Sequence, residues 1–146
     1  MLRISTKGRY ATRILTYLAG QGTPVPARTQ DIAASEGISA DYVEQILMKL
    51  KSGGLVRSHR GTRGGFSLAR DPRRITVAEV LRVTEGPIEL VPCEQECCVR
   101  ANKCVTRCVW ERASSALQEV FAGVTVAEMA ATAGALRAAE GQSFEI

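Results

Sequence analysis

The sequence lacks several features that would assign it to a large class of proteins at once. No apolar run approaches the roughly 18 residues of a transmembrane helix, and the first residues contain no uninterrupted apolar stretch of the signal-peptide type. The chain has one histidine, His59. No combination of a nucleophile, a base and an orienting group, as in a catalytic site, can be recognised in the sequence. Internal repeats and long linkers are also absent. We therefore expect a cytoplasmic protein that is not an enzyme and has no membrane partner.

Paired CxxC motifs are missing as well, although the chain has five cysteines between Cys93 and Cys108. The spacing C-x3-C-C-x5-C-x3-C therefore does not match a zinc ribbon or finger. A chain of 146 residues can bury a core without disulfides, and in a reducing compartment clustered thiols more often serve metal or redox chemistry. Thiolate chemistry ranks an iron–sulfur cluster first, zinc second and a thiol–disulfide switch third.

Charge is unevenly distributed along the chain. Residues 1–74 contain 13 Lys and Arg against 5 Asp and Glu, a net charge of +8. Residues 75–146 contain 6 against 10, a net charge of −4. Such an asymmetry is typical of a chain in which one end binds a polyanion.

The N-terminal half has the pattern of a winged helix-turn-helix. Apolar spacing predicts a helix over 5–19, a short helix from Thr29 that ends before Gly37, and a third helix capped by Ser39. Two helices joined by a tight turn are typical of helix-turn-helix proteins. The segment "LVRSHRGTRGGFSLAR" then predicts a β-hairpin, the wing.

The second half predicts further helices. Capping boxes begin at Thr76 and Thr125, and an apolar stripe predicts a helix over 109–122 that needs a partner surface. The predicted fold class is mainly α with a small β-hairpin wing: a winged helix-turn-helix domain plus a long C-terminal dimerisation helix. We expect the DNA-binding domain over 1–86, a cysteine-rich loop over 87–108, the dimerisation helix and a short helix over 109–133, and a tail, disordered or not, over 134–146.

Polar side chains in the third helix and arginines in the hairpin are candidates for DNA contacts. Gln45 can pair with adenine, Glu44 can accept from a cytosine amino group, and arginine is favoured in a minor groove. The simpler alternative is a solvated, charged surface. The predicted contact residues are Ser39, Asp41, Tyr42, Glu44, Gln45 and Lys49 in the third helix, Arg57, Arg60 and Arg63 in the hairpin, and Lys7 and Arg9 in the first helix.

Four motifs together resemble the IscR/NsrR-type family of winged-helix transcription regulators. They are "LRISTKGRYATRIL", "ISADYVEQILMKLKSGGLVRSHRGTRGGFSLARD", "ITVAEVLRVTEGP" and the cysteines followed by Trp110. The resemblance covers about residues 1 to 133. It implies a homodimer that binds double-stranded promoter DNA, with an iron–sulfur cluster in the loop before the long helix and cluster state controlling binding.

The resemblance also implies a ligand set. Three family ligands map onto Cys93, Cys98 and Cys104, but Arg107 stands where IscR-like members have a histidine, and arginine does not bind metals at ordinary pH. The region Lys7-Gly8-Arg9 offers no acidic ligand of the NsrR-like kind. The predicted set is therefore Cys93, Cys98, Cys104 and Cys108, with Cys97 as a substitute for Cys93; three cysteines plus an exogenous ligand is the alternative.

The predicted function is thus an iron–sulfur cluster-dependent transcription regulator, with a [2Fe–2S] cluster favoured over a [4Fe–4S] cluster. Cluster status, nitric oxide, iron, oxygen and sulfur metabolites all stay open as the signal. Two alternatives remain: a zinc- or thiol–disulfide-based redox regulator on the same fold, and an iron–sulfur carrier or electron-transfer protein.

Overall fold

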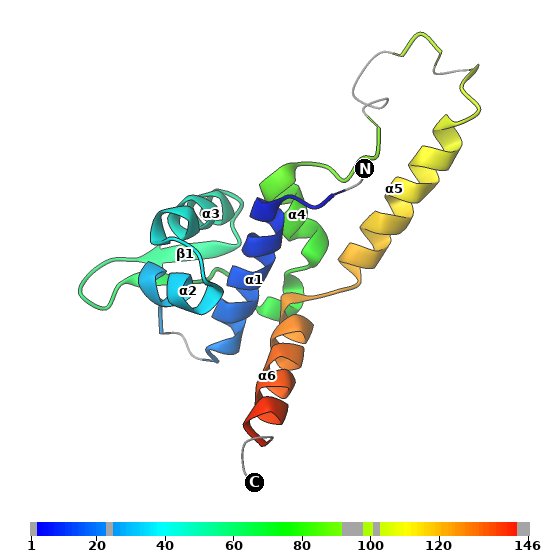
Figure 1. Ribbon diagram of the computed structural model, residues 1–146. Helices are drawn as coiled ribbons and strands as arrows, with labels where there is room; N and C mark the ends of the chain where they lie inside the picture. Colours follow the sequence, from blue (N-terminus) through cyan, green and yellow to red (C-terminus); the bar gives the residue numbers. More distant parts are fainter. Residues whose placement is uncertain (1–2, 23–24, 92–97, 101–102, 143–146) are drawn as a thin grey trace.

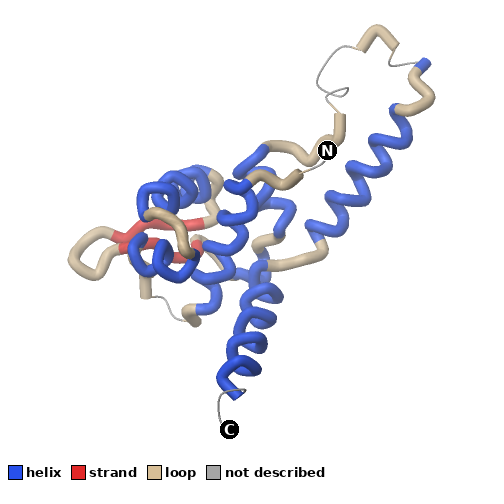
Figure 2. Tube along the Cα trace, in the orientation of Figure 1, coloured by secondary structure: helices blue, strands red, loops and turns tan. Residues whose placement is uncertain are grey.

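The computed structural model describes residues 3–22, 25–91, 98–100 and 103–142. Within these ranges the chain forms six α-helices, one 3₁₀ helix and one two-stranded antiparallel hairpin (Figures 1 and 2). The elements are α1 Thr6–Gly20, α2 Thr29–Glu36, α3 Ala40–Ser52, β1 Val56–His59, β2 Gly65–Leu68, η1 Pro72–Arg74, α4 Val77–Glu85, α5 Arg107–Ala122 and α6 Val126–Gln142. No helix in these ranges is both long and apolar enough to cross a bilayer. The predicted fold class, mainly α with a hairpin wing, is confirmed.

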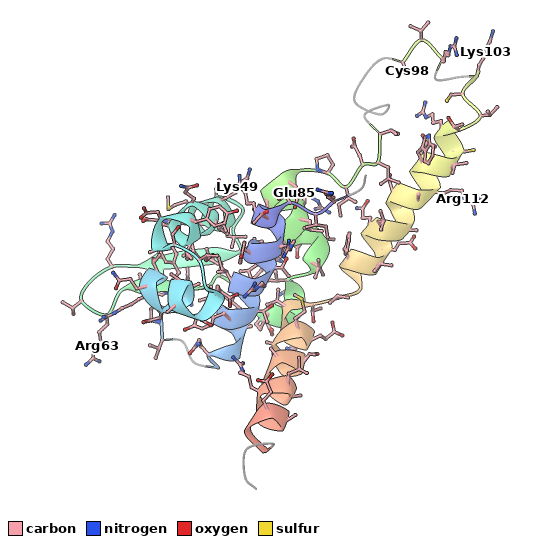
Figure 3. All side chains as sticks on the ribbon, in the orientation of Figure 1. Lys49, Arg63, Glu85, Cys98, Lys103 and Arg112 are labelled. Carbon is pink, nitrogen blue, oxygen red and sulfur yellow. The ribbon has the colours of Figure 1, made fainter. Side chains whose placement is uncertain are left out.

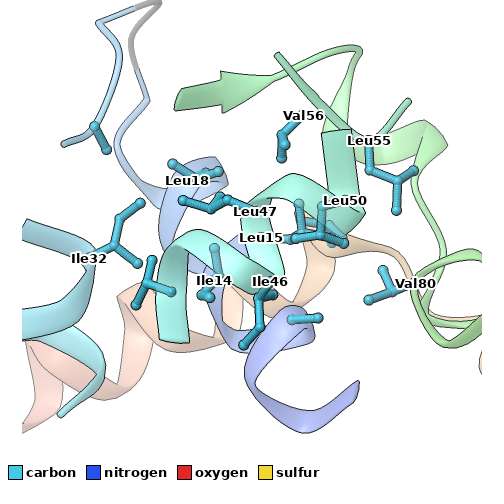
Figure 4. Packing of buried hydrophobic residues seen from close by; sticks show 14 of the residues in the cluster. Ile14, Leu15, Leu18, Ile32, Ile46, Leu47, Leu50, Leu55, Val56 and Val80 are labelled. Atoms are coloured by element: carbon cyan, nitrogen blue, oxygen red, sulfur yellow. The ribbon is translucent and has the colours of Figure 1, made fainter. Parts of the chain in front are cut away.

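The core lies where α1, α2 and α3 meet the base of the hairpin. Ser5 caps α1, because its side-chain oxygen accepts a hydrogen bond from the backbone N–H of Gly8. Apolar side chains spaced by three or four residues then turn one face of each helix inward (Figure 4). The labelled residues of this cluster are Ile14, Leu15, Leu18, Ile32, Ile46, Leu47, Leu50, Leu55, Val56 and Val80.

The turn between α2 and α3 sets the angle of α3. Gly37 ends α2 with φ at +67°, in the left-handed region that favours glycine, and its N–H bonds to the carbonyl of Ala33. Two residues later the Ser39 hydroxyl oxygen accepts a hydrogen bond from the N–H of Tyr42 at 3.3 Å. The helix-turn-helix predicted from these residues is confirmed.

The hairpin is attached to the helices along one edge. β1 and β2 pair from Val56 with Leu68 to His59 with Gly65. Ala27, just before α2, forms two backbone hydrogen bonds with Phe66 at 2.8 and 2.9 Å. A Cβ on Gly65 would meet the Ala27 carbonyl oxygen at 2.3 Å, so this close approach needs glycine.

The chain returns to the core after α5. The N–H of Val77 bonds to the carbonyl of Val124 at 3.0 Å, and the N–H of Val126 bonds to the carbonyl of Ile75 at 2.9 Å. Val126 is completely buried in the same core cluster as α1 and α3. The core therefore includes a residue far beyond the boundary expected at residue 86.

The expectation of a short last helix followed by a tail at 134–146 is wrong for the residues up to Gln142. The predicted capping box is present, with Glu128 accepting from the N–H of Thr125 at 2.7 Å, but α6 runs on to Gln142 and packs against α1. Alanine, abundant in this segment, has the highest intrinsic helix propensity, which explains the extension. Residues 143–146 of the expected tail lie outside the described residues.

Candidate nucleic-acid interface and cysteine segment

The outward face of α3 carries the predicted base-contacting side chains. Val43, Ile46, Leu47 and Leu50 are completely buried, so the helix presents its opposite side to solvent. The predicted contact residues Asp41, Glu44, Gln45 and Lys49 are all exposed, and Ser39 is exposed at the helix start.

Tyr42 differs from its predicted neighbours on α3. Its side chain is half-buried and packs edge-to-face on Tyr10 of α1, with ring centroids 6.0 Å apart. Tyr42 therefore ties α3 to α1.

The wing extends its arginines away from the body of the protein. Arg60 and Arg63 are exposed in the loop between β1 and β2, and Figure 3 shows Arg63 at the end of the molecule opposite to Cys98. Arg57 lies in β1, and its Nε donates to Ser67 Oγ at 3.3 Å. His59, also in β1, forms a hydrogen bond with the same Ser67 oxygen at 2.8 Å. These bonds join the two strands of the wing through side chains.

Two further side chains connect the wing to the helix-turn-helix. Lys51 Nζ, at the end of α3, donates to Ser58 Oγ of β1 at 2.7 Å. Arg28, which precedes α2, donates from its guanidinium to the carbonyl oxygen of Thr62 at 3.1 Å. The wing is thus held at its first strand by Lys51 and at its loop by Arg28. Sequence reasoning missed Arg28 and Lys51, because nothing local in their surroundings indicates a partner.

The start of α1 is anchored to the end of α4. Lys7 and Arg9 are exposed on the first turns of α1. Between them Gly8 is buried, and a Cβ at this position would meet Glu85 Oε1 at 2.0 Å and Leu81 Cδ2 at 3.0 Å. The predicted DNA contacts Lys7 and Arg9 therefore stand on a helix end that touches the last helical turn before the cysteine segment, residues 93–108.

The cysteine segment is described in part. Cys98 and Cys108 are exposed, Cys104 is half-buried, and all three are free thiols. Cys93 and Cys97 lie outside the described residues, so the predicted set of four ligands cannot be assembled from the described part of the segment. Among the described residues no three metal-binding side chains come together.

The thiols of Cys104 and Cys108 have different surroundings. Cys104 Sγ shares a hydrogen bond with Thr106 Oγ1 at 3.3 Å, and this bond, with the backbone N–H groups of Thr106 and Arg107, lowers the pKa of the Cys104 thiol. Cys108 Sγ instead donates to the carbonyl oxygen of Val105 at 3.3 Å. Because α5 begins at Arg107, two residues earlier than the predicted Val109, Cys108 belongs to the helix.

Arg107 is engaged with its own helix. Its Nε pairs with the carboxylate of Glu111 one turn later. This ion pair uses the side chain that stands where the resemblance implies a histidine.

The helix α5 has an apolar stripe that is only partly covered by the rest of the chain. None of its residues is buried, although Val109, Trp110, Leu117, Val120 and Phe121 repeat at helical spacing. Trp110 is 40% exposed and Val120 is 63% exposed, so neither belongs to the core of this chain. In Figure 1 the helix projects from the body, with its N-terminal end outermost.

Comparison with known proteins identifies the family to which the chain belongs. A family model described as "Rrf2: Iron-dependent Transcriptional regulator" matches residues 4–132. The chain belongs to the Rrf2 family of transcriptional regulators. This Rrf2-family chain is 32% identical over 145 residues to the HTH-type transcriptional regulator IscR of Xenorhabdus nematophila, an alignment that covers 99% of the chain and 88% of that protein.

Solved structures agree with this family and with its DNA-binding winged-helix fold. CymR of Bacillus subtilis, described as the global cysteine regulator, superposes with a TM-score of 0.78 at 36% identity, over 90% of this Rrf2-family chain and 98% of that chain. IscR of T. potens superposes with a TM-score of 0.74 at 36% identity, over 90% and 88% of the two chains. The predicted membership of an IscR-type family of transcription regulators is confirmed.

Proposed function

We propose that this protein is an iron–sulfur cluster-dependent regulator that binds promoter DNA as a homodimer. The observation that carries the proposal is the position of the free thiols of Cys104 and Cys108 at the start of α5, a helix whose apolar stripe is only partly covered by the rest of the chain. A group bound there sits at one end of the surface that a second copy of the chain would cover. Its presence or loss can therefore change the dimer without touching DNA.

The DNA-binding part of the proposal rests on α3 and the wing. The exposed face of α3 enters the major groove, where Glu44 and Gln45 contact base edges. Arg60 and Arg63 lie on the loop that enters the neighbouring minor groove. Lys7 and Arg9 on α1, with Ser39 and Tyr42, contact phosphates, which position the protein without reading sequence.

The dimer part of the proposal rests on α5. Its stripe exposes several large apolar side chains on one helix, which is unusual for a monomeric soluble protein. The stripe continues at Leu117 and Phe121 into a groove beside the start of α1 and the end of α4. Ile4, Leu81 and Ile88 supply its apolar lining, and charged residues such as Arg9 and Glu85 stand at the same groove. A second α5 packed along this surface would bury it and bring the two winged helices into fixed positions.

The cluster part of the proposal rests on the chemistry of the donors. The described thiols are free, and the hydrogen bonds to Cys104 favour its thiolate, the form that binds metals. Cys93, Cys98, Cys104 and Cys108 would hold the cluster, and Arg107 would stay paired with Glu111. When bound, the cluster supplies a redox-active iron centre.

The test combines metal analysis with DNA binding. Protein purified without oxygen is expected to absorb visible light, to contain iron and acid-labile sulfide in equal amounts, and to retain a promoter fragment. Cys104→Ser is expected to abolish the absorbance and change DNA binding while the dimer persists in light scattering. Val99→Ser, at an exposed residue beside Cys98 that is not a predicted ligand, serves as the control and should keep the cluster. A colourless wild type, or a cluster-free variant with unchanged DNA binding under every redox condition, would contradict the proposal.

A thiol-based regulator is the second candidate, and the lowered pKa of Cys104 favours it. Similar structures include CymR of Staphylococcus aureus in an oxidized form, at 29% identity and a TM-score of 0.71. In this case the purified protein would be colourless, and oxidation would remove free thiols and change DNA binding. Stoichiometric zinc would instead identify a zinc regulator. An iron–sulfur carrier would keep the cluster and fail to retain any promoter fragment.

A further inference from the structure

The outward face of α3 carries one large apolar side chain, Met48. It is 52% exposed, whereas Leu47 and Leu50 beside it are completely buried. The predicted contacts to DNA did not include it. In the middle of a polar, solvent-facing surface, an exposed methionine contributes nothing to the core of this chain.

Helical geometry places Met48 among the predicted base contacts. Residues three and four apart share a face, so Met48 stands one turn beyond Glu44 and Gln45 and two turns beyond Asp41. Side chains on an α-helix also lean toward its N-terminus and cover the surface of the preceding turn. The thioether therefore extends toward Glu44 and Gln45, at the centre of the face opposite to the buried residues Val43 and Ile46.

The major groove contains one apolar group that such a side chain can contact. Every base edge there presents hydrogen-bond donors or acceptors, and only thymine adds the C5-methyl group. Methionine is flexible and polarizable, so it can follow a methyl surface without fixed geometry. Lys49 and Lys51, on the same helix, supply positive charge near the phosphates on either side.

We propose that Met48 contacts the C5-methyl group of a thymine and so makes this regulator prefer thymine at one position of each half-site. The inference rests on the proposed binding of DNA by α3. Met48 is not part of the dimer stripe, because that stripe lies on α5, which projects from the body on a different side from α3 (Figure 1).

The experiment first finds the DNA sequence and then removes single methyl groups. Duplexes that bind the wild-type protein are selected from a random pool, and each thymine of the selected site is replaced in turn by uracil, which lacks only the methyl. At one position per half-site the wild type should lose about fourfold in affinity, the value of burying one methyl-sized group. Met48→Ala should bind the thymine and uracil duplexes equally at that position.

Three further variants test whether the thymine preference depends on an apolar side chain at position 48. Met48→Leu, apolar and of similar size, should keep the thymine preference, and Met48→Gln, of similar length but polar, should lose it. Leu136→Ala is the matched control, because Leu136 is an exposed apolar residue on α6. Equal discrimination between thymine and uracil by wild type and Met48→Ala at every position overturns the inference. Failure of the wild type to enrich any duplex instead overturns the proposed DNA binding.

Discussion

The carboxylate of Glu85 accepts two hydrogen bonds from Ser5, one from its backbone N–H and one from its hydroxyl, each 3.0 Å long. Ser5 caps α1, and Glu85 is the last residue of α4, so one side chain joins the start of the chain to the element that leads into the cysteine segment. The contact requires the two helices to approach closely, and Gly8 is the residue that permits it.

Gly8→Ala should therefore destabilise the protein. Alanine is the better helix former, but its methyl group would press on Leu81 Cδ2 and would force the Glu85 carboxylate to move, which costs the hydrogen bonds from Ser5. We expect the free energy of unfolding to fall by about 1–3 kcal/mol, the usual cost of overpacking. Denaturant unfolding measures this change.

Gly134→Ala is the matched control for this prediction. Gly134 lies in α6, and nothing stands within 4 Å of its added Cβ. Because alanine has the higher helix propensity and meets no neighbour here, the free energy of unfolding should rise by about 0.5–1 kcal/mol. Equal effects of the two substitutions would show that the close approach of α1 and α4 at Gly8 does not limit the free energy of unfolding.

Arg28→Gln should weaken DNA binding about fivefold, the value of one hydrogen bond of roughly 1 kcal/mol. The reason is that the wing loop loses its bond from Arg28 to the Thr62 carbonyl. Arg28 acts on the loop rather than on a phosphate. The slope of log affinity against log salt concentration should therefore stay as in the wild type. Arg60→Ala, which removes a proposed DNA contact, should reduce that slope by about one. A reduced slope for Arg28→Gln would mean that Arg28 itself contacts a phosphate.

Trp110→Asp should shift the protein from dimer to monomer. Trp110 is exposed in the apolar stripe of α5, and a buried aromatic at an interface commonly contributes 2 kcal/mol or more, so the dimer Kd should rise by about thirtyfold or more. Sedimentation across a concentration series measures it. Leu136→Asp places the same charge on an exposed residue of α6 and should leave the dimer intact, and dissociation by both variants would contradict α5 as the interface.

Stability should fall in acid partly through Glu79. Burial alone would raise the pKa of Glu79, but hydrogen bonds from Arg70 at 2.6 Å and from the N–H of Thr76 at 3.1 Å outweigh it and lower the pKa. A carboxylate with a lowered pKa stabilises the folded state above its ordinary value near 4.5, and this contribution is lost as the pH falls. Glu79→Gln should therefore flatten the decline of melting temperature below about pH 5.

Glu140→Gln is the control for the acid series. Glu140 is exposed on α6, so its substitution should leave the acid decline as steep as in the wild type. A Glu79→Gln protein that loses stability in acid as steeply as the wild type would show that the Arg70 and Thr76 bonds have little effect on folding.

Local signals in the sequence were sufficient to predict much of the fold. Ser39 and the Thr76–Glu79 capping box mark helix starts, and both form the predicted hydrogen bonds. The wing follows from its glycines and alternating apolar residues. These features act over a few residues, so they can be recognised without knowledge of the rest of the molecule.

The contacts missed by the sequence reasoning act over long separations or depend on context. Arg28 and Thr62 are 34 residues apart, and Ser5 and Glu85 are 80 apart, so no local pattern pairs them. The length of α6 was underestimated because its apolar stripe is weak and packing on α1 helps to hold it. Met48 could have been found, since its spacing from Glu44 already places it on the outward face.

The pairing of Val77 with Val124 brings the two ends of the intervening stretch close together. The chain leaves the core at Gly86, the end of α4, and returns beside the first residue of the same nine-residue helix, a span of only about 14 Å. A linker of some five or six residues could bridge that distance. We therefore predict that the winged helix still folds when it is rejoined without residues 87–123, or when it is given the corresponding stretch of another family member. If the cysteine segment is the sensor, as proposed, the signal that the regulator senses would be separable from the DNA sequence that it reads.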